Sequence, residues 1–317
     1  LPEKDRVEFE HFEGNAQGFR IITRTEMYKN AGGFRLALGS LGAFTKYPVA
    51  AATRPHIGSE AVVNGMRYIG LKKYGFFEND IDTFAEVANE LELPATDVRG
   101  PSGEVIGQWW RRHPLAYLME AADDICYNIM DLEDAYLAGD VEYDVASRAL
   151  DSLIVNNNKS YPSQGQEDGI ARRRALAIRW AINSCVEAFK ENYSAIMSGE
   201  FSTSLVESSN KSKEFRDIKD LTKSRIFKAA RKTELEVYGR NVVYKILDGL
   251  MPLVNEMENV GYDSSGLGQY HKQLVHALKF PIDTFHDSYT ALHAVTDFVS
   301  GTTDRYAVKV AEMIGRG

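Results

Sequence analysis

The sequence has few cysteines, no long apolar run and no hydrophobic signal core in its first ten residues. Only two cysteines, Cys126 and Cys185, occur in 317 residues, too few for a disulfide framework or a cysteine-rich zinc site. Both lie among apolar residues of predicted helices, where we expect them to be small buried side chains. No apolar stretch approaches the ~18 residues that a membrane-spanning helix needs. These absences predict a soluble, cytoplasmic protein with no membrane partner.

Common nucleotide-binding and nucleophile motifs are also missing. The sequence contains no GxGxxG loop, P-loop, GxSxG elbow or CxxC pair, which excludes the usual dinucleotide-binding, P-loop, serine-hydrolase and zinc-ribbon classes. The 45 acidic residues outnumber the 37 basic residues, and the formal net charge is -8. This balance argues against a dominant nucleic-acid-binding surface but permits a local basic patch.

Apolar residues recur mainly at three- and four-residue steps, and strict two-residue alternation is rare. This spacing predicts a nearly all-α fold without internal repeats. Two stretches rich in glycine, proline and polar residues are expected to be loops, at residues 94–108 and 155–168. A terminal helix is expected to start at Thr303 and Asp304, after a break at Gly301.

The most informative stretch is a predicted long helix from His113 to Ala138. Pro114 suits its first turn, because the N–H that proline lacks would be unpaired there anyway. Gly139 closes the far end. Apolar residues at helical spacing cover most of two faces, so we expect the helix to be largely buried.

Three polar residues share one stripe of this helix. Asp123, Tyr127 and Asp131 are spaced at i, i+4 and i+8, which places them on one face at about 100° per residue. A carboxylate on a mostly buried helix needs a metal, a cation or a set of hydrogen bonds. The spacing alone leaves open both a structural salt bridge or cap contact and a metal or substrate site.

Earlier in the chain, two short segments contain candidate phosphate ligands. Gly14 and Asn15 are a predicted helix start with Asn15 as the N-cap, and N–H groups at such an end favour an anion. Lys46 and Tyr47 precede Pro48, which ends a predicted helix. The lysine could complement the dipole at the end of the helix while the tyrosine ring packs against the core, or both residues could bind phosphate.

Other charged groups have ordinary explanations beside functional ones. Lys72 and Lys73 form a pair of a kind that is usually solvated. The three arginines at residues 172–174 suit either a solvated helix face or a nucleotide or nucleic-acid phosphate site. His286 and Asp287 form an HD dipeptide, but they lie at a loop-to-helix boundary, where we expect an N-cap instead of a metal site.

Six segments occur in an order typical of one family: FEGNAQGFRIITR, KYP, LKKYGFF, HPLAYLMEAADDICYNIMDLEDA, ELEVYGRNVVYKILDGL and SGTTDRYA. Together they resemble the C-terminal two-thirds of a bacterial deoxyguanosine triphosphate triphosphohydrolase, of the HD-domain phosphohydrolase superfamily. The resemblance spans nearly all of the chain. It implies an all-α, multi-helix HD-domain-like bundle that lacks the N-terminal part of the HD core. Residues 1–140 would be the C-terminal part of the catalytic core, and residues 141–317 a helical region packing on it.

The resemblance also implies an activity, the hydrolysis of a deoxynucleoside triphosphate, classically dGTP, to the nucleoside and tripolyphosphate. A divalent metal, Mg²⁺ or Mn²⁺, would assist the reaction. By the same resemblance, Asp123 is a metal ligand, Tyr127 packs against the substrate near the sugar, and Asp131 contacts the 3′ side of the sugar.

The remaining site residues follow from the resemblance too. Asn15, Lys46, Tyr47 and Lys73 match positions that hold the triphosphate. The family's metal-binding His and His-Asp, and its acid–base His and Glu, are expected upstream of Leu1, so no catalytic residue is assigned within the chain. The resemblance further implies a homo-oligomer.

Two other functions stay open. A catalytically incomplete regulatory homologue would bind a nucleotide effector or single-stranded DNA, using residues 172–174 and the loop at 155–168, without turnover. A helical scaffold with no site would satisfy the acids of the long helix by neighbouring arginine and lysine side chains.

Overall fold

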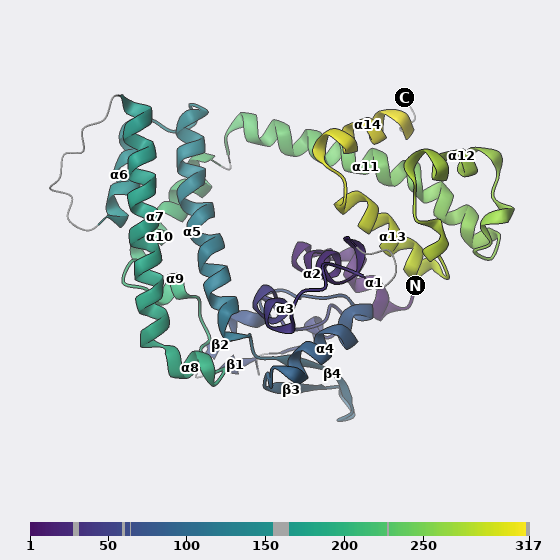
Figure 1. The fold of residues 1–317 in the computed structure, drawn as a ribbon, viewed down its shortest axis with the longest axis horizontal. Coiled ribbons are helices and arrows are strands. Elements are labelled where there is room, and N and C mark those ends of the chain that lie inside the picture. Colours follow the sequence, from purple (N-terminus) through teal and green to yellow (C-terminus); the bar gives the residue numbers. More distant parts are fainter. Residues whose placement is uncertain (28–31, 59–60, 64, 155–164, 227, 315–317) are drawn as a thin grey trace.

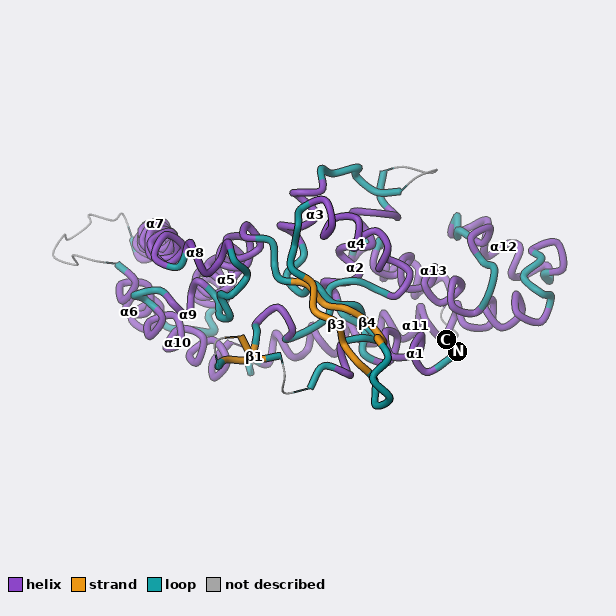
Figure 2. Tube along the Cα trace, turned by 90° about the horizontal axis from the view of Figure 1, so that it is seen from below, coloured by secondary structure: helices purple, strands orange, loops and turns teal. Residues whose placement is uncertain are grey.

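The structure, a computed structural model, describes residues 1–27, 32–58, 61–63, 65–154, 165–226 and 228–314. Helices dominate this part of the chain, which confirms the expected fold class (Figure 1). The strands within it form two small antiparallel ribbons (Figure 2). One pairs β1 (Val62–Val63) with β2 (Met66–Arg67), and the other pairs β3 (Ala95–Arg99) with β4 (Val105–Trp110).

Aromatic side chains form the core of the N-terminal region. This region contains the helices α1 (Glu3–Glu10), α2 (Gly14–Arg20), α3 (Leu38–Phe44) and α4 (Ile81–Glu90). The rings of Phe76 and Phe84 stack 4.6 Å apart, and Phe19 and Trp110 contact both of them. Because these rings come from α2, α4, β4 and a connecting segment, their burial joins parts far apart in the sequence.

The long helix predicted from the sequence is α5 (Pro114–Leu137), and both predicted boundaries are confirmed. Its N-cap is His113, and Gly139 follows it with φ of 79°, a conformation that favours glycine. It packs with five further helices around one apolar cluster. These are α6 (Tyr143–Leu153), α7 (Gln166–Glu191), α8 (Tyr193–Met197), α9 (Leu205–Ser208) and α10 (Ser212–Leu221).

The expectation that most of two faces of α5 would be buried is wrong. Ile125, Ile129 and Leu132 are buried in the apolar cluster, but Met130 is 43% exposed. Cys126 is exposed as well, so of the two cysteines only Cys185 is the buried side chain that we expected. The reason is that α5 carries apolar residues on several of its faces, whereas the neighbouring helices cover only one face.

The C-terminal region has its own apolar core and is tied to the N-terminal helices by an ion pair and a buried hydrogen bond. It contains α11 (Ala230–Asn259), α12 (Gln269–Leu278), α13 (Ser288–Ser300) and α14 (Asp304–Ile314). The Arg20 guanidinium donates to both carboxylate oxygens of Asp297 at 2.8 to 3.0 Å. His293 lies 2.7 Å from the Glu8 carboxylate, and both are buried. These pairs connect α13 to α1 and α2.

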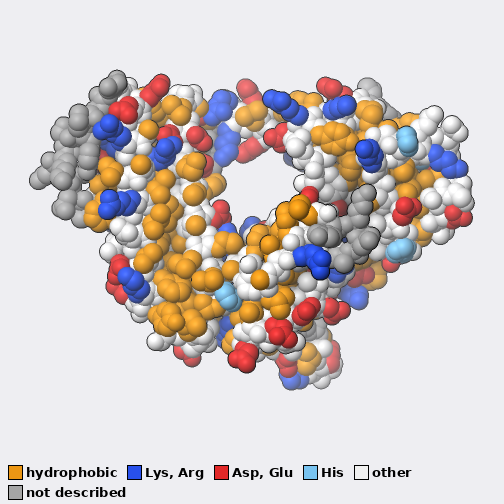
Figure 3. All heavy atoms as spheres, in the orientation of Figure 1, with side chains coloured by type: hydrophobic (Ala, Val, Ile, Leu, Met, Phe, Trp, Pro, Cys, Tyr) orange, Lys and Arg blue, Asp and Glu red, His pale blue; other side chains and the backbone are white. Residues whose placement is uncertain are grey.

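Viewed as in Figure 3, the described part of the molecule encloses an opening. The helix α5 borders it on one side and α11 spans its top, while α13 and α2 lie on the other side (Figure 1). At its first residues, α11 is tied to the turn after α5 by an ion pair of 3.1 Å between Arg231 and Asp140. The division of the chain at residue 140 stays a prediction.

Two local predictions are wrong. Residues 94–108 were expected to be a loop, but most of them form the ribbon of β3 and β4. Only Val98 of β3 is buried, so the sequence of this strand resembles that of an exposed loop. The ribbon is held in place by pairing of β4 with Pro48 and Val49. Asn15 is not the N-cap of α2, because Glu13 takes that position and accepts a hydrogen bond from the Asn15 backbone N–H.

Other local predictions are confirmed. Asp287 is the N-cap of α13 and forms a capping box with Thr290, so the HD dipeptide has the structural role that we expected. Gly301 follows α13, and α14 begins at Asp304. In the described ranges, no helix combines the length and the apolar character needed to cross a bilayer.

Candidate functional site

The acidic stripe of α5 is accessible, in contrast to the burial expected for it. The carboxylate side chain of Asp123 is 68% exposed, and Tyr127 is 48% exposed. Asp131 is half-buried. Partial burial raises the pKa of Tyr127, and the negative charge of Asp131 raises it further, which indicates that the two side chains are close.

Asp123 forms an ion pair with Lys46, one of the predicted phosphate ligands. The Lys46 ammonium donates to an Asp123 carboxylate oxygen at 2.5 Å. Lys46 belongs to the segment after α3, so the pair joins two predicted site residues 77 positions apart. The lysine side chain is only 15% exposed, whereas the carboxylate is open to solvent on its other side.

Arg112 fixes the main chain of Lys46 against α5. Its guanidinium is buried, donates from Nε to the Lys46 carbonyl oxygen at 2.5 Å, and makes two bonds of 2.7 and 3.1 Å to the Glu120 carboxylate. It also lies over the rings of Tyr47 and Tyr117. A bidentate pair of this kind is geometrically specific. The position of Lys46 is therefore set by α5 through a buried contact as well as by Asp123.

A second backbone contact brings Lys73 toward the same segment. Residues 49–51 pair with residues 75–76 through bonds from Gly75 N to Val49 O and from Ala51 N to Phe76 O. A Cβ at Gly75 would lie 2.2 Å from the Tyr47 carbonyl oxygen, so only glycine permits this approach.

Glu13 joins two of the other predicted phosphate ligands. One of its carboxylate oxygens accepts from the Asn15 side-chain amide at 2.7 Å and from the Lys73 ammonium at 3.1 Å. Lys73 is 46% exposed, while the Glu13 side chain is 14% exposed. Asn15 and Lys73 therefore belong to one cluster at the start of α2, as the phosphate-site hypothesis requires.

Tyr47 lies between this cluster and α5. Burial raises the pKa of its phenol to about 12, and the charges of Glu120, Glu13 and Asp124 contribute in the same direction, while Arg112 opposes them. Because such effects act at short range, Tyr47 has the Glu13 cluster near it as well as the acids of α5. The phenol is buried, so it would donate a hydrogen bond to a ligand and not bind it as an anion.

Asp124 is an acid that the sequence interpretation overlooked. Its pKa is raised to about 6, chiefly by burial and also by the charges of Glu120 and Asp123, while Lys46 and Lys219 oppose the rise. Its carboxyl group therefore changes charge close to neutral pH, beside the Lys46–Asp123 pair. Such a shift is common at functional sites, although buried structural pairs produce it too.

Glu13, Arg112 and Glu120 were also overlooked. One available signal was the spacing of Glu120 and Asp124, a second i, i+4 acid pair on α5 beside the predicted stripe. Arg112 and Glu13 each have a near partner, but their contacts with the Lys46 carbonyl oxygen and the Lys73 ammonium span 66 and 60 residues, which local spacing does not indicate.

The described residues do not fit a resident divalent metal by themselves. A metal needs several ligands, and within the described ranges no group of three or more His, Cys, Asp or Glu side chains has a suitable arrangement. Asp123 is the only predicted ligand in the chain, and its carboxylate is bound to Lys46. No chemical step can be derived through a metal from these residues alone.

The arginines at residues 172–174 are all engaged in ion pairs. Arg172 pairs with Asp168 and Arg173 with Asp151, at 3.3 and 3.0 Å, and Arg174 pairs with Glu133. Their charges are therefore compensated by neighbours of the same chain. Of the loop predicted at 155–168, residues 155–164 lie outside the described residues.

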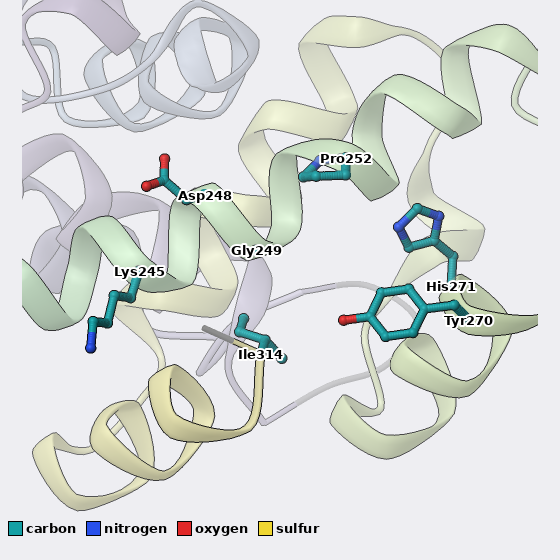
Figure 4. Close-up of a pocket in the computed structure, with 7 residues that line it drawn as sticks. All are labelled: Lys245, Asp248, Gly249, Pro252, Tyr270, His271 and Ile314. Atoms are coloured by element: carbon teal, nitrogen blue, oxygen red, sulfur yellow. The ribbon is translucent and has the colours of Figure 1, made fainter. Parts of the chain in front are cut away.

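A cavity of about 570 Å³ lies in the C-terminal region, between α11, α12 and the end of α14 (Figure 4). Figure 4 shows the Tyr270 hydroxyl pointing into the space below α11, and the Asp248 carboxylate above that helix. Lys245 and Asp248 carry opposite charges, and His271 is hydrogen-bonded to Glu256. The lining therefore lacks the excess of positive charge that a triphosphate needs.

Comparison with known proteins identifies relatives that cover nearly the whole chain, although no protein-family model matches it. A deoxyguanosinetriphosphate triphosphohydrolase-like protein of Synechocystis sp. is 31% identical over 316 residues, which are 98% of this chain and 66% of that protein. A protein of the same name from Pseudomonas aeruginosa is 29% identical over 325 residues, covering all of this chain and 68% of that protein. A deoxyguanosinetriphosphate triphosphohydrolase of Yersinia pestis is 25% identical over 358 residues, which are 97% of this chain and 64% of that protein. The chain thus spans about two-thirds of the length of the curated relatives it matches.

Proposed function

Because the chain belongs to the deoxyguanosinetriphosphate triphosphohydrolase-like family, we propose that the protein containing it hydrolyses a deoxynucleoside triphosphate. The first candidate substrate is dGTP, and the products would be the deoxynucleoside and tripolyphosphate. The observation that carries this proposal is the grouping of Lys46, Lys73 and Asn15 near Tyr47, beside the exposed carboxylate of Asp123 on α5. These residues come from three separate segments of the chain.

The charges of this group suit a triphosphate. A triphosphate carries about four negative charges, and charge-assisted hydrogen bonds from lysine are the stronger kind. Lys46 and Lys73 are each paired with one carboxylate, Asp123 and Glu13. Pairs with an exposed member contribute only about 0 to 1 kcal/mol, so a polyanion can replace these carboxylates at little cost.

Asp123 would then be available to a divalent cation, Mg²⁺ or Mn²⁺. Its carboxylate would supply one ligand, and groups other than the described residues would supply the rest. Tyr127 and Asp131, one and two turns farther along α5, would contact the sugar of the substrate. The accessibility of this face of α5 supports the assignment, since a substrate site must be open.

The decisive experiment measures tripolyphosphate release from dGTP by the protein containing residues 1–317, with Mg²⁺ or Mn²⁺ supplied. We expect Asp123→Asn to reduce the rate about 100-fold or more, because it removes a charged metal ligand. The matched control is Asp134→Asn, the same substitution at an exposed position of the same helix, and it should leave the rate unchanged.

The products distinguish the proposal from other phosphohydrolases. Release of pyrophosphate instead of tripolyphosphate would refute the proposed bond cleavage. Equal rates for Asp123→Asn and Asp134→Asn would refute the role of Asp123. Repeating the assay with the other deoxynucleoside triphosphates tests the preference for dGTP.

A nucleotide-binding regulatory protein without turnover is the second candidate. The observation favouring it is that the described residues contribute a single predicted metal ligand, Asp123. Saturable dGTP binding without any tripolyphosphate release would support it over the enzyme. Binding of single-stranded DNA that falls steeply with salt would extend it to nucleic acid, and light scattering measures the expected homo-oligomer.

A further inference from the structure

Three basic side chains line one cavity near the β1–β2 ribbon. The cavity has a volume of about 310 Å³ and is lined by Arg54, Arg67 and Lys72 together with hydroxyl-bearing residues at 202–203. It lies between Arg54 and residues 67–72 on one side and the loop after α8 on the other. None of the described residues that line it is acidic.

In the part of the chain that the structure describes, these three charges have no compensating partner. Among the described residues, none of the three side chains has a hydrogen-bond or ion-pair partner, and Arg54 Nε is buried without one. Burial lowers the pKa of Arg54, and the nearby positive charge of Arg67 lowers it further. Arg112, by contrast, is matched by a carboxylate. A buried unpaired donor among like charges is costly unless a ligand satisfies it.

The walls of the cavity are held by hydrogen bonds that do not involve the three bases. The backbone N–H of Ile69 donates to the Ser202 carbonyl oxygen at 3.1 Å, which joins the two walls. Tyr68 is 1% exposed, and its hydroxyl accepts from the Arg112 backbone N–H at 2.7 Å. On the opposite wall, the Tyr117 hydroxyl donates to the Phe201 carbonyl oxygen at 2.6 Å. The site is therefore built before any ligand arrives.

We propose that this cavity binds the phosphate groups of a small polyanionic ligand, the polyphosphate chain of a nucleotide or an inorganic polyphosphate. Two guanidinium groups and an ammonium provide charge-assisted donors for phosphate oxygens. The hydroxyl groups of Ser202 and Thr203 line the same cavity. Its volume lies at the lower end of the range for small-molecule sites, which suits a phosphorylated ligand of limited size.

This proposal is independent of the proposed function. The cavity shares no lining residue with the Lys46–Asp123 pair or with the cluster around Glu13. The larger cavity of Figure 4 differs in its lining, which includes the acidic Asp248 as well as Lys245. The smaller cavity is distinguished by three basic side chains and no acidic one among its described lining residues.

The test measures binding at this cavity directly, in EDTA, so that no metal-dependent turnover takes place. Sodium tripolyphosphate is titrated by calorimetry, and the acetylation of Lys72 by an amine-reactive reagent is followed by mass spectrometry. We expect tripolyphosphate to protect Lys72, which is exposed, while Lys190 on the surface of α7 stays unprotected. Sodium chloride at equal ionic strength controls for screening.

The variants locate the effect. Arg54→Gln with Arg67→Gln should weaken tripolyphosphate binding about tenfold or more and abolish protection of Lys72. Arg148→Gln, at an exposed position of α6, is the matched control and should behave as the parent protein. Protection of Lys72 that persists in the double variant, or that is absent from the parent, would overturn the proposal.

A comparison of dGTP with tripolyphosphate identifies the source of the phosphate. Stronger protection by dGTP than by tripolyphosphate would assign the cavity to a nucleotide, and the reverse order would assign it to an inorganic polyphosphate. Protection by neither would overturn the proposal. A failure to hydrolyse dGTP would leave every one of these readings unchanged, because none depends on turnover.

Discussion

Asp124 provides a test of the electrostatics around α5. Its carboxyl group is half-buried beside Glu120, Asp123 and the Lys46 ammonium. Burial raises its pKa from the ordinary 3.8 to about 6. Since the charged form is the disfavoured one, replacing Asp124 with neutral asparagine should stabilise the protein at neutral pH.

The magnitude and the sign follow from linkage. A difference of about two pKa units corresponds to about 3 kcal/mol. Between about pH 4 and pH 6 the folded state binds more protons at Asp124 than the unfolded state does, so this group makes stability fall as pH rises. Below about pH 4 the group is protonated in both states and its penalty is absent, whereas above about pH 6 the full penalty is present.

Urea denaturation at several pH values between 4 and 8 measures this effect. We expect Asp124→Asn to exceed the parent protein by about 2 to 3 kcal/mol at pH 7.5 and to match it near pH 4. Asp134→Asn, at an exposed position of α5, is the control and should show neither difference. If Asp124→Asn were less stable than the parent at pH 7.5, the carboxylate would be held by Lys46 as a favourable ion pair, and the reasoning from burial would be refuted.

Three further substitutions test other parts of the structure. Glu120→Gln removes the counter-charge of the buried Arg112 and should lower the free energy of unfolding by about 3 to 5 kcal/mol in urea, and a loss below about 1 kcal/mol would contradict the burial of the pair. Gly75→Ala places a Cβ 2.2 Å from the Tyr47 carbonyl oxygen, so we expect a loss of about 2 kcal/mol or more in the same measurement; an unchanged unfolding midpoint would contradict that contact. Asp297→Ala removes the carboxylate that α2 binds, and hydrogen exchange should then rise in α13 more than in α7. Equal exchange in both helices would show that this carboxylate does not hold α13.

The helical elements could be predicted from the sequence because their signals are local. Pro114 begins α5, Gly139 follows its end, and Asp287 caps α13, so the ends of these helices depend on residues close to them. The ribbon of β3 and β4 had no such signal. Its second strand pairs with Val49 through Trp109, a contact between segments about 60 residues apart, and local spacing cannot reveal it.

The candidate site could be predicted in part, for the same reason. Asp123, Tyr127 and Asp131 share one side of α5 as helical geometry requires, but their exposure depends on which neighbours pack against α5. The contacts of Lys46 with Asp123 and of Lys73 with Glu13 join distant segments. Spacing along the chain did not indicate them, and the family resemblance named only some of the residues.

Lys46 is joined to α5 by two contacts, one strong and one weak. The Lys46 carbonyl oxygen is bound by Arg112, which is bound by Glu120 on α5, and the Lys46 ammonium is bound by Asp123 on the same helix. The first path is buried and bidentate, whereas the second ends on a carboxylate that is 68% exposed and contributes about 0 to 1 kcal/mol. Because the buried path fixes the main chain, the ammonium can leave Asp123 for an incoming anion without any movement of the segment that carries it. Arg112 and Glu120 thereby stabilise the fold and also leave the Lys46 ammonium free to exchange Asp123 for another partner.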